Sequence, residues 1–127
     1  MKITSARLLV VDDDAVMRKY VVDSLRRMGI QTIETCADGE SALNLAESFK
    51  PDLVLTDIHM EPMDGFEFVR QLRKHPSLAL RKTRVIFMSA DSSSATLEEA
   101  LPLGTYGYIV KPPRPEILLA KLELALK

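Results

Sequence analysis

The chain has 127 residues, of which 46% are hydrophobic, so it can bury one ordinary core but is too short for two domains. Its formal net charge of -1 argues against a general attraction to nucleic acid or to an anionic membrane. The single cysteine, Cys36, excludes an internal disulfide, and no apolar run approaches the ~20 residues of a membrane span. We therefore expect a cytoplasmic protein with one domain over residues 1–127.

Five short runs of aliphatic and β-branched residues predict buried strands. They cover residues 7–11, 32–36, 53–56, 84–88 and 108–110.

Segments with helical periodicity lie between these runs. Met17, Val21 and Leu25 share one face of a first helix, which Gly29 ends. Asp38 and Asp64 are expected N-caps of the next two helices, the latter running towards His75. A fourth helix is expected over residues 96–101, and a fifth over 115–127.

The alternation of strands and helices predicts an α/β fold, with helices on both faces of a doubly wound, five-stranded parallel sheet. We assume the strand order 2-1-3-4-5 of flavodoxin-like (βα)5 proteins, an order that this pattern alone does not determine.

Polar side chains follow four of the predicted strands. They are Asp12, Asp13 and Asp14 after the first, Asp57 after the third, Ser89 after the fourth and Lys111 after the fifth. In the assumed order, the carboxyl ends of these strands place the groups around one pocket. Crowded carboxylates need a counter-charge, and Mg²⁺ prefers such oxygen ligands. A carboxylate acceptor, a metal, an ammonium and a hydroxyl are the parts that phosphoryl transfer needs.

Four segments, VVDDD, LVLTDIHM, IFMSA and YIVKP, resemble in order and spacing the receiver domains of two-component response regulators. The resemblance covers nearly the whole chain. It implies a signalling switch, not a turnover enzyme, that takes a phosphoryl group from a sensor histidine kinase or a histidine phosphotransfer protein. It also implies these roles: acceptor Asp57; Mg²⁺ ligands Asp12, Asp13, Asp57 and the carbonyl of His59; phosphoryl-binding and switch residues Ser89, Lys111 and Tyr108.

Several nearby residues are interpreted as structural. Asp14 is expected to cap the first helix, and Cys36 to be a small buried hydrophobe. The rings of His59 and His75 are expected to face solvent.

The sequence departs from the family pattern at three places. Pro62 comes one position later than in the commonest form. The resemblance implies a cis bond before Pro112, whereas Pro113 has no explanation from the sequence. Arg114 occupies the expected N-cap of the last helix, where Ser or Asp is usual.

Two other classes of protein remain as alternatives. Asp12, Asp14 and Val16 match the D-x-D-x-[TV] pattern of haloacid-dehalogenase-like phosphatases, but the later acidic motif of that family is missing. A flavodoxin-like FMN carrier would need a loop rich in Ser, Thr and Gly after the first strand, where this chain has three carboxylates. The sequence also leaves open whether the chain is a stand-alone regulator or the input part of a longer protein.

The last helix is more apolar than a single docking face requires. Leu118, Leu122 and Ala125 form the stripe expected to face the sheet. Leu119 and Leu126 flank it on one side, and Ile117 and Leu124 on the other. Either neighbouring elements cover these flanks, or one flank binds a second copy or an output partner. For the second case we expect Leu119 and Leu126 to be the docking residues.

Overall fold

The computed structural model describes residues 1–90 and 101–127. Strands and helices alternate along the chain, as the sequence predicts. The strands are β1 (Arg7–Val11), β2 (Thr32–Cys36), β3 (Leu53–Asp57), β4 (Arg84–Ser89) and β5 (Gly107–Val110). The helices are α1 (Ala15–Arg27), α2 (Gly39–Phe49), α3 (Gly65–Arg73), α4 (Leu78–Arg81) and α6 (Pro115–Ala125), with 3₁₀ turns η1 (Ile3–Ser5) and η2 (Leu101–Leu103).

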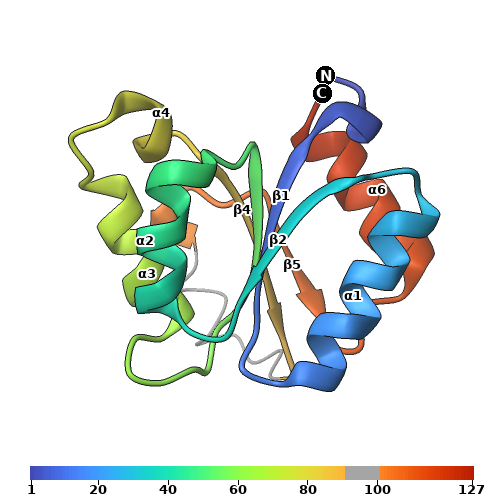
Figure 1. The fold of residues 1–127 in the computed structure, drawn as a ribbon, viewed down its shortest axis with the longest axis horizontal. Helices are drawn as coiled ribbons and strands as arrows, with labels where there is room; N and C mark the ends of the chain where they lie inside the picture. Colours follow the sequence, from blue (N-terminus) through green and yellow to red (C-terminus); the bar gives the residue numbers. More distant parts are fainter. Residues whose placement is uncertain (91–100) are drawn as a thin grey trace.

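The five strands form one parallel sheet in the order β2-β1-β3-β4-β5. Helices α1 and α6 cover one face of the sheet, and α2 and α3 cover the other (Figure 1). The expected doubly wound fold and its strand order are therefore confirmed.

The central strands β1, β3 and β4 are mainly apolar, with polar residues towards their ends, because both faces of the sheet are covered. In β1, Leu8 and Val10 pack in the cluster that includes α1 and α6, whereas Leu9 and Val11 pack in the cluster with α2 and α3. All five residues of β3 are buried. Each strand begins and ends within one residue of its predicted bounds, and the polar residues at the carboxyl ends of β1 and β3 are therefore fixed by the core.

The helices depart from the prediction in three places. The helix expected over 96–101 lies mostly outside the described residues, and the chain forms the η2 turn at Leu101–Leu103. The short helix α4 was not predicted, although Ser77 caps it by accepting a hydrogen bond from the Leu80 amide. The last helix begins at Pro115 as expected but ends at Ala125.

The expectation that His75 faces solvent is wrong, because its side chain is only 20% exposed. Its Nδ1 accepts a hydrogen bond from the Ser77 amide at 2.9 Å. Its Nε2 lies 3.6 Å from Oε2 of Glu47 on α2. The imidazole thus links the turn before α4 to a neighbouring helix.

The stripe of α6 formed by Leu118, Leu122 and Ala125 is buried, as predicted. Of the two expected docking residues, Leu119 is half-buried, whereas the expectation for Leu126 is wrong. Leu126 is only 1% exposed because it follows the last helical residue and packs into the core, where helical periodicity no longer predicts its direction. The exposed flank consists of Ile117 and Leu124, which are 43% and 66% exposed.

Within residues 1–90 and 101–127, the helices are all too short or too polar to span a bilayer.

Candidate functional site: an acidic group at the carboxyl ends of the strands

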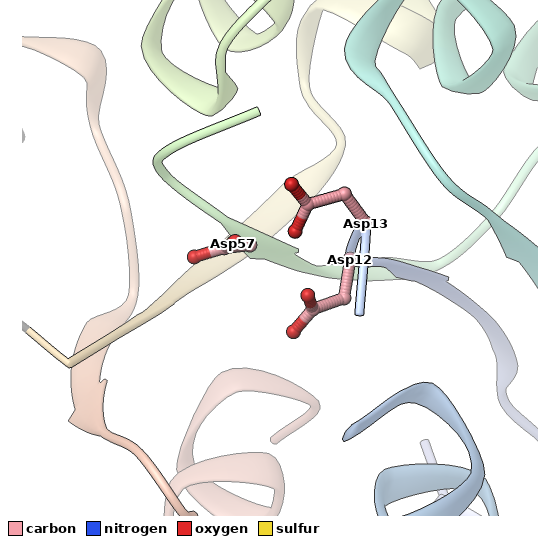
Figure 2. Close-up of side chains that lie close together, drawn as sticks. All are labelled: Asp12, Asp13 and Asp57. Atoms are coloured by element: carbon pink, nitrogen blue, oxygen red, sulfur yellow. The ribbon is translucent and has the colours of Figure 1, made fainter. Parts of the chain in front are cut away.

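Three carboxylates meet where β1 and β3 end side by side. Asp12 and Asp13 directly follow β1, and Asp57 is the last residue of β3 (Figure 2). One carboxylate oxygen from each residue lies within 4.8 Å of those of the other two. Asp12 is fully buried and Asp57 is 6% exposed, whereas Asp13 is open to solvent. The three carboxylates thus lie close together, as the sequence analysis expects, and their roles stay a prediction.

Lys111, which follows β5, brings a positive charge into this group. Its Nζ lies 2.6 Å from Oδ2 of Asp12 and 3.2 Å from Oδ1 of Asp57. Burial acts to lower the pKa of Lys111, but its bonds to Asp12 and Asp57 outweigh this effect and raise the pKa. The ammonium therefore stays protonated at neutral pH, and one cation faces three carboxylates.

The Asp57 carboxylate is less stable as an anion than an exposed one. Burial raises its pKa, and repulsion from Asp12 acts in the same direction. The Lys111 ammonium and the Ile58 amide, which donates to Oδ1 of Asp57 at 2.8 Å, lower the pKa without cancelling the rise. The described groups of the site therefore carry more negative than positive charge.

Backbone contacts hold Asp12 in place. Its amide donates to the Cys36 carbonyl at 3.1 Å, and its own carbonyl accepts from Nη1 of Arg18 at 2.7 Å. Oδ1 of Asp12 accepts from the Asp14 amide at 2.9 Å. Arg18 was not singled out from the sequence, since a lone arginine on a helix gives no signal of such a contact.

Asp14 caps α1, as predicted. Its Oδ1 accepts hydrogen bonds from the amides of Val16 and Met17 at 2.9 and 3.2 Å. Its carboxylate does not belong to the acidic group. The phosphatase pattern needs Asp14 beside Asp12 in the site, so this geometry speaks against that alternative.

Ser89 and Lys111 lie at the adjacent ends of β4 and β5. The side chain of Ser89 is buried, and its carbonyl accepts a hydrogen bond from the Lys111 amide at 2.9 Å. Tyr108, on β5, is half-buried and packs against the cluster that contains α2 and α3. Among the described residues its buried hydroxyl has no hydrogen-bond partner. These three residues thus lie on neighbouring strands near the site.

The loops around the site contain two cis peptide bonds. The bond between Lys111 and Pro112 is cis, as expected, and the bond between Glu61 and Pro62 is cis as well. Pro113 is buried, and its carbonyl accepts a hydrogen bond from the Tyr20 hydroxyl at 2.9 Å.

Other expectations near the site can be compared directly with the structure. The His59 side chain is exposed, as expected, and lines a hollow of about 450 Å³ together with Asp13 and Glu61. Arg114 is the N-cap of α6 and makes no side-chain capping bond. Cys36 is half-buried, and burial raises the pKa of its thiol from 9.0 to about 11.

Gly65 is a residue that the sequence analysis missed. A Cβ atom at this position would collide with the backbone carbonyl oxygen of Asp57. The Gly65 amide donates to the Ile58 carbonyl at 2.8 Å, which brings the start of α3 against the end of β3. The dipeptide formed by Asp64 and Gly65 was interpreted only as a helix start.

The donor set of the site suits a hard divalent cation. The ligand atoms that converge are carboxylate oxygens, and the described residues contain no group of His and Cys ligands that would favour Zn²⁺. Mg²⁺ commonly binds one or two carboxylates together with water and phosphate oxygens. Asp12, Asp13 and Asp57 could hold such an ion, and the excess negative charge described above would favour it.

Comparison with known proteins agrees with this geometry. The family model of the response regulator receiver domain matches residues 8–123. The chain is 33% identical to the chemotaxis response regulator CheY4 of Vibrio cholerae, over 94% of this chain and 98% of that one, with a TM-score of 0.84. It is 27% identical to a protein in the CheX–CheY–BeF3–Mg complex of Borrelia burgdorferi, over 96% and 90% of the two chains, with a TM-score of 0.87.

Matches among curated proteins are to parts of longer proteins. A protein-glutamate methylesterase/protein-glutamine glutaminase of Koribacter versatilis is 37% identical over 115 residues, which cover 88% of this chain and 30% of that protein. In other curated relatives that match, the shared region covers between 22% and 56% of their length. The fold, the acidic group and the family match over residues 8–123 lead to one conclusion: the chain belongs to the response regulator receiver domains of two-component signalling.

Proposed function

We propose that the chain is one receiver domain over residues 1–127 and that Asp57 is its phospho-acceptor. The observation that carries the proposal is the position of the Asp57 carboxylate. It is nearly buried, lies in the same group as Asp12 and Asp13, and is 3.2 Å from the Lys111 ammonium. The phosphoryl donor is a phosphohistidine of a sensor histidine kinase or of a histidine phosphotransfer protein.

The proposed phosphoryl transfer is a displacement reaction at the phosphorus atom. An oxygen of the Asp57 carboxylate attacks the phosphorus atom, and the bond between phosphorus and the donor imidazole nitrogen breaks. The electron pair of that bond returns to the imidazole, which takes up a proton, and an acyl phosphate forms on Asp57. Such a transfer needs mainly positioning and neutralisation of charge.

The carboxylates of Asp12, Asp13 and Asp57, with the backbone carbonyl of His59, would hold Mg²⁺. When bound, Mg²⁺ supplies positive charge to the phosphoryl oxygens as they approach the carboxylates. The Asp14 amide orients the Asp12 carboxylate for this role. The Cys36 carbonyl and the Arg18 side chain hold the Asp12 backbone in place.

Lys111 and Ser89 would bind the phosphoryl group once it is attached. The Lys111 ammonium already lies against Asp57, and a phosphoryl group at that position offers it doubly charged oxygens. Ser89 ends the adjacent strand, so its hydroxyl can donate to another phosphoryl oxygen. Movement of Ser89 towards Asp57 would open space for Tyr108 to turn inward, which is a shift between two conformations that differ by a few kcal/mol.

The proposed output is a change of surface and not turnover of a substrate. A second copy of the chain or a downstream partner would bind the changed surface. This binding would take place in the cytoplasm, and the chain would not contact nucleic acid directly. The formal net charge of -1 and the match to chemotaxis regulators support this view.

Incubation with acetyl phosphate and Mg²⁺ tests the acceptor directly. Intact mass spectrometry should detect one added phosphoryl group, which Asp57→Asn abolishes. Asp23→Asn is the matched control, because that carboxylate pairs with Lys19 on the exposed surface of α1. A label that persists in Asp57→Asn, or that forms undiminished in EDTA, would exclude the proposal.

The coupling of Ser89 to Tyr108 needs a separate measurement. Beryllofluoride with Mg²⁺ mimics the acyl phosphate and should shift the amide NMR signals of both residues. Shifts restricted to Asp57 and its immediate neighbours would show that the site does not move these strand ends.

A further inference from the structure

A second pocket lies at the opposite edge of the sheet, where β3, β4 and β5 begin. Its volume is about 590 Å³, within the usual range of ~300–1,000 Å³ for small-molecule sites. Asp52, Arg84 and Tyr106 lie at the amino ends of these three strands and line the pocket. β4 separates it from the phosphorylation site, and six residues of strand span roughly 20 Å.

The pocket is strongly basic. Five cationic side chains line it, and Asp52 is the only carboxylate among its lining residues. The five are Lys50, Arg73, Arg81, Lys82 and Arg84. In the part of the chain that the structure describes, none of them forms an ion pair with a carboxylate. Among residues 1–90 and 101–127, these five positive charges therefore have no paired carboxylate, although Asp52 lines the same pocket.

Arg73 forms the rigid part of this pocket. Its guanidinium donates to the carbonyls of Leu103, Arg81 and Thr83 at 2.9, 3.0 and 2.8 Å. These bonds join the end of α3 to the start of β4 and to the η2 turn, but carbonyl oxygens leave the charge of Arg73 in place. Burial lowers the pKa of Arg73, so a nearby anion would stabilise its charged form.

Tyr106 adds an aromatic surface to the basic wall. Tyr106 is 53% exposed, and its amide donates to the Val85 carbonyl at 2.8 Å, which fixes the backbone from which the ring projects. An exposed aromatic ring beside cations can stack on a planar heterocycle while the cations bind phosphate oxygens.

Cations at helix ends also have a structural explanation. Lys50, Arg73 and Arg81 lie at the carboxyl ends of α2, α3 and α4, where the helix dipole favours positive charge. That explanation does not extend to Arg84, which is in a strand, or to Tyr106. The helix dipole also does not explain why these side chains line one common pocket.

We propose that this basic pocket, defined by Lys50, Arg73, Arg81, Lys82, Arg84 and Tyr106, binds a phosphate-bearing small molecule with a planar ring, of the nucleotide class. Lys50, Arg81, Lys82 and Arg84 would bind the phosphate. Arg73, whose guanidinium also donates to the Gly104 carbonyl at 3.4 Å, would add its charge, and the Tyr106 ring would stack on the heterocycle. The proposal is independent of the function proposed for Asp57. A small molecule is favoured over a nucleic acid because the cations surround a concave pocket and the whole chain carries a slight net negative charge.

Calorimetric titration with AMP, pyrophosphate and adenosine tests the proposal. The titrations are done in EDTA at low ionic strength, so that metal-dependent binding near Asp57 does not contribute. AMP and pyrophosphate should bind saturably, and adenosine, which lacks the phosphate, should not. Amide NMR shifts with AMP should centre on Thr83, Arg84 and Tyr106, and Asp57→Asn should not change the affinity.

Two sets of variants separate the roles of charge and ring. Lys82→Gln with Arg84→Gln should weaken both AMP and pyrophosphate at least about tenfold, which corresponds to the loss of one hydrogen bond to a charged group. Tyr106→Ala should weaken AMP but leave pyrophosphate unchanged. Lys19→Gln with Arg26→Gln is the matched control, because it removes the same charge from the surface of α1. If the double variant does not fold, Lys82→Gln alone tests the same point on an exposed side chain.

Three results would overturn the proposal. The first is the absence of saturable AMP binding to the unmodified chain, which would leave the cations a structural role only. The second is equal weakening by the pocket variant and the α1 control, which would indicate general charge attraction. The third is a single-stranded oligonucleotide that binds far more tightly than AMP and covers more than the pocket.

Discussion

Replacement of Lys111 by methionine tests whether its ammonium holds the acidic group together. The Lys111 side chain is 13% exposed, and it lies 2.6 Å from Asp12 and 3.2 Å from Asp57. At an effective dielectric constant of ~20, the attraction across 2.6 Å is about 6 kcal/mol, before the cost of removing both charges from water. Loss of one partner from a buried ion pair typically destabilises a protein by about 3–5 kcal/mol. We expect Lys111→Met to lower the free energy of unfolding by that amount.

Urea unfolding followed by circular dichroism measures this change. At neutral pH the raised pKa of Lys111 keeps its ammonium protonated, so the stabilisation is fully present there and is lost only as the pH rises through that pKa. The experiment is done in EDTA and repeated with Mg²⁺, which should restore part of the loss if the carboxylates hold the ion as proposed. Lys19→Met is the control, because it breaks an exposed pair with Asp23 that solvent screens, so its loss should cost far less. Equal losses in the two variants would refute the reasoning.

Further predictions concern the packing around the site and the exposure of single residues. Gly65→Ala should destabilise the chain by about 1–3 kcal/mol in urea unfolding, because its Cβ would collide with the Asp57 carbonyl; an unchanged midpoint would contradict this. Cys36, with its pKa raised to about 11, should react with iodoacetamide at neutral pH about a hundredfold more slowly in the folded chain than in urea. Similar rates would show that the thiol is not protected. Leu126→Ala should cost about 2–5 kcal/mol, whereas Leu124→Ala on the exposed flank should cost far less; similar losses would contradict the observed burial.

The sequence predicted the central strands well because burial on both faces leaves a direct signal. Residues 7–11 match β1 without error, and four of its five residues are buried. Residues 32–36 match the bounds of β2, but the expectation of a buried strand is wrong there, because β2 is an edge strand with no buried residue and only its β-branched residues gave the signal. The acidic group followed from the same signal, since Asp12 and Asp57 come directly after such runs. The strand order was assumed from flavodoxin-like (βα)5 proteins, because the sequence pattern does not specify which strands are neighbours.

What the sequence could not predict depends on contacts between distant segments. The need for glycine at position 65 comes from the close approach of the Asp57 carbonyl, which no local pattern encodes. Leu126 was assigned to a surface flank because helical periodicity was extended past Ala125, where the helix ends. The basic pocket was missed because its cations come from three separate segments, and the basic run at residues 81–84 gives no sign that Lys50 and Arg73 lie beside it.

The buried hydroxyl of Tyr108 has a consequence for the energy of the resting conformation. A buried polar group without a partner costs about 1–3 kcal/mol, and among the described residues the Tyr108 hydroxyl has none. The conformers of a two-state protein commonly differ by only a few kcal/mol. The cost of this one hydroxyl is therefore comparable to the whole difference between two conformers. In the switch proposed above, Tyr108→Phe would remove that cost from the conformation described here, so this arrangement should become more populated without any change at the acidic group.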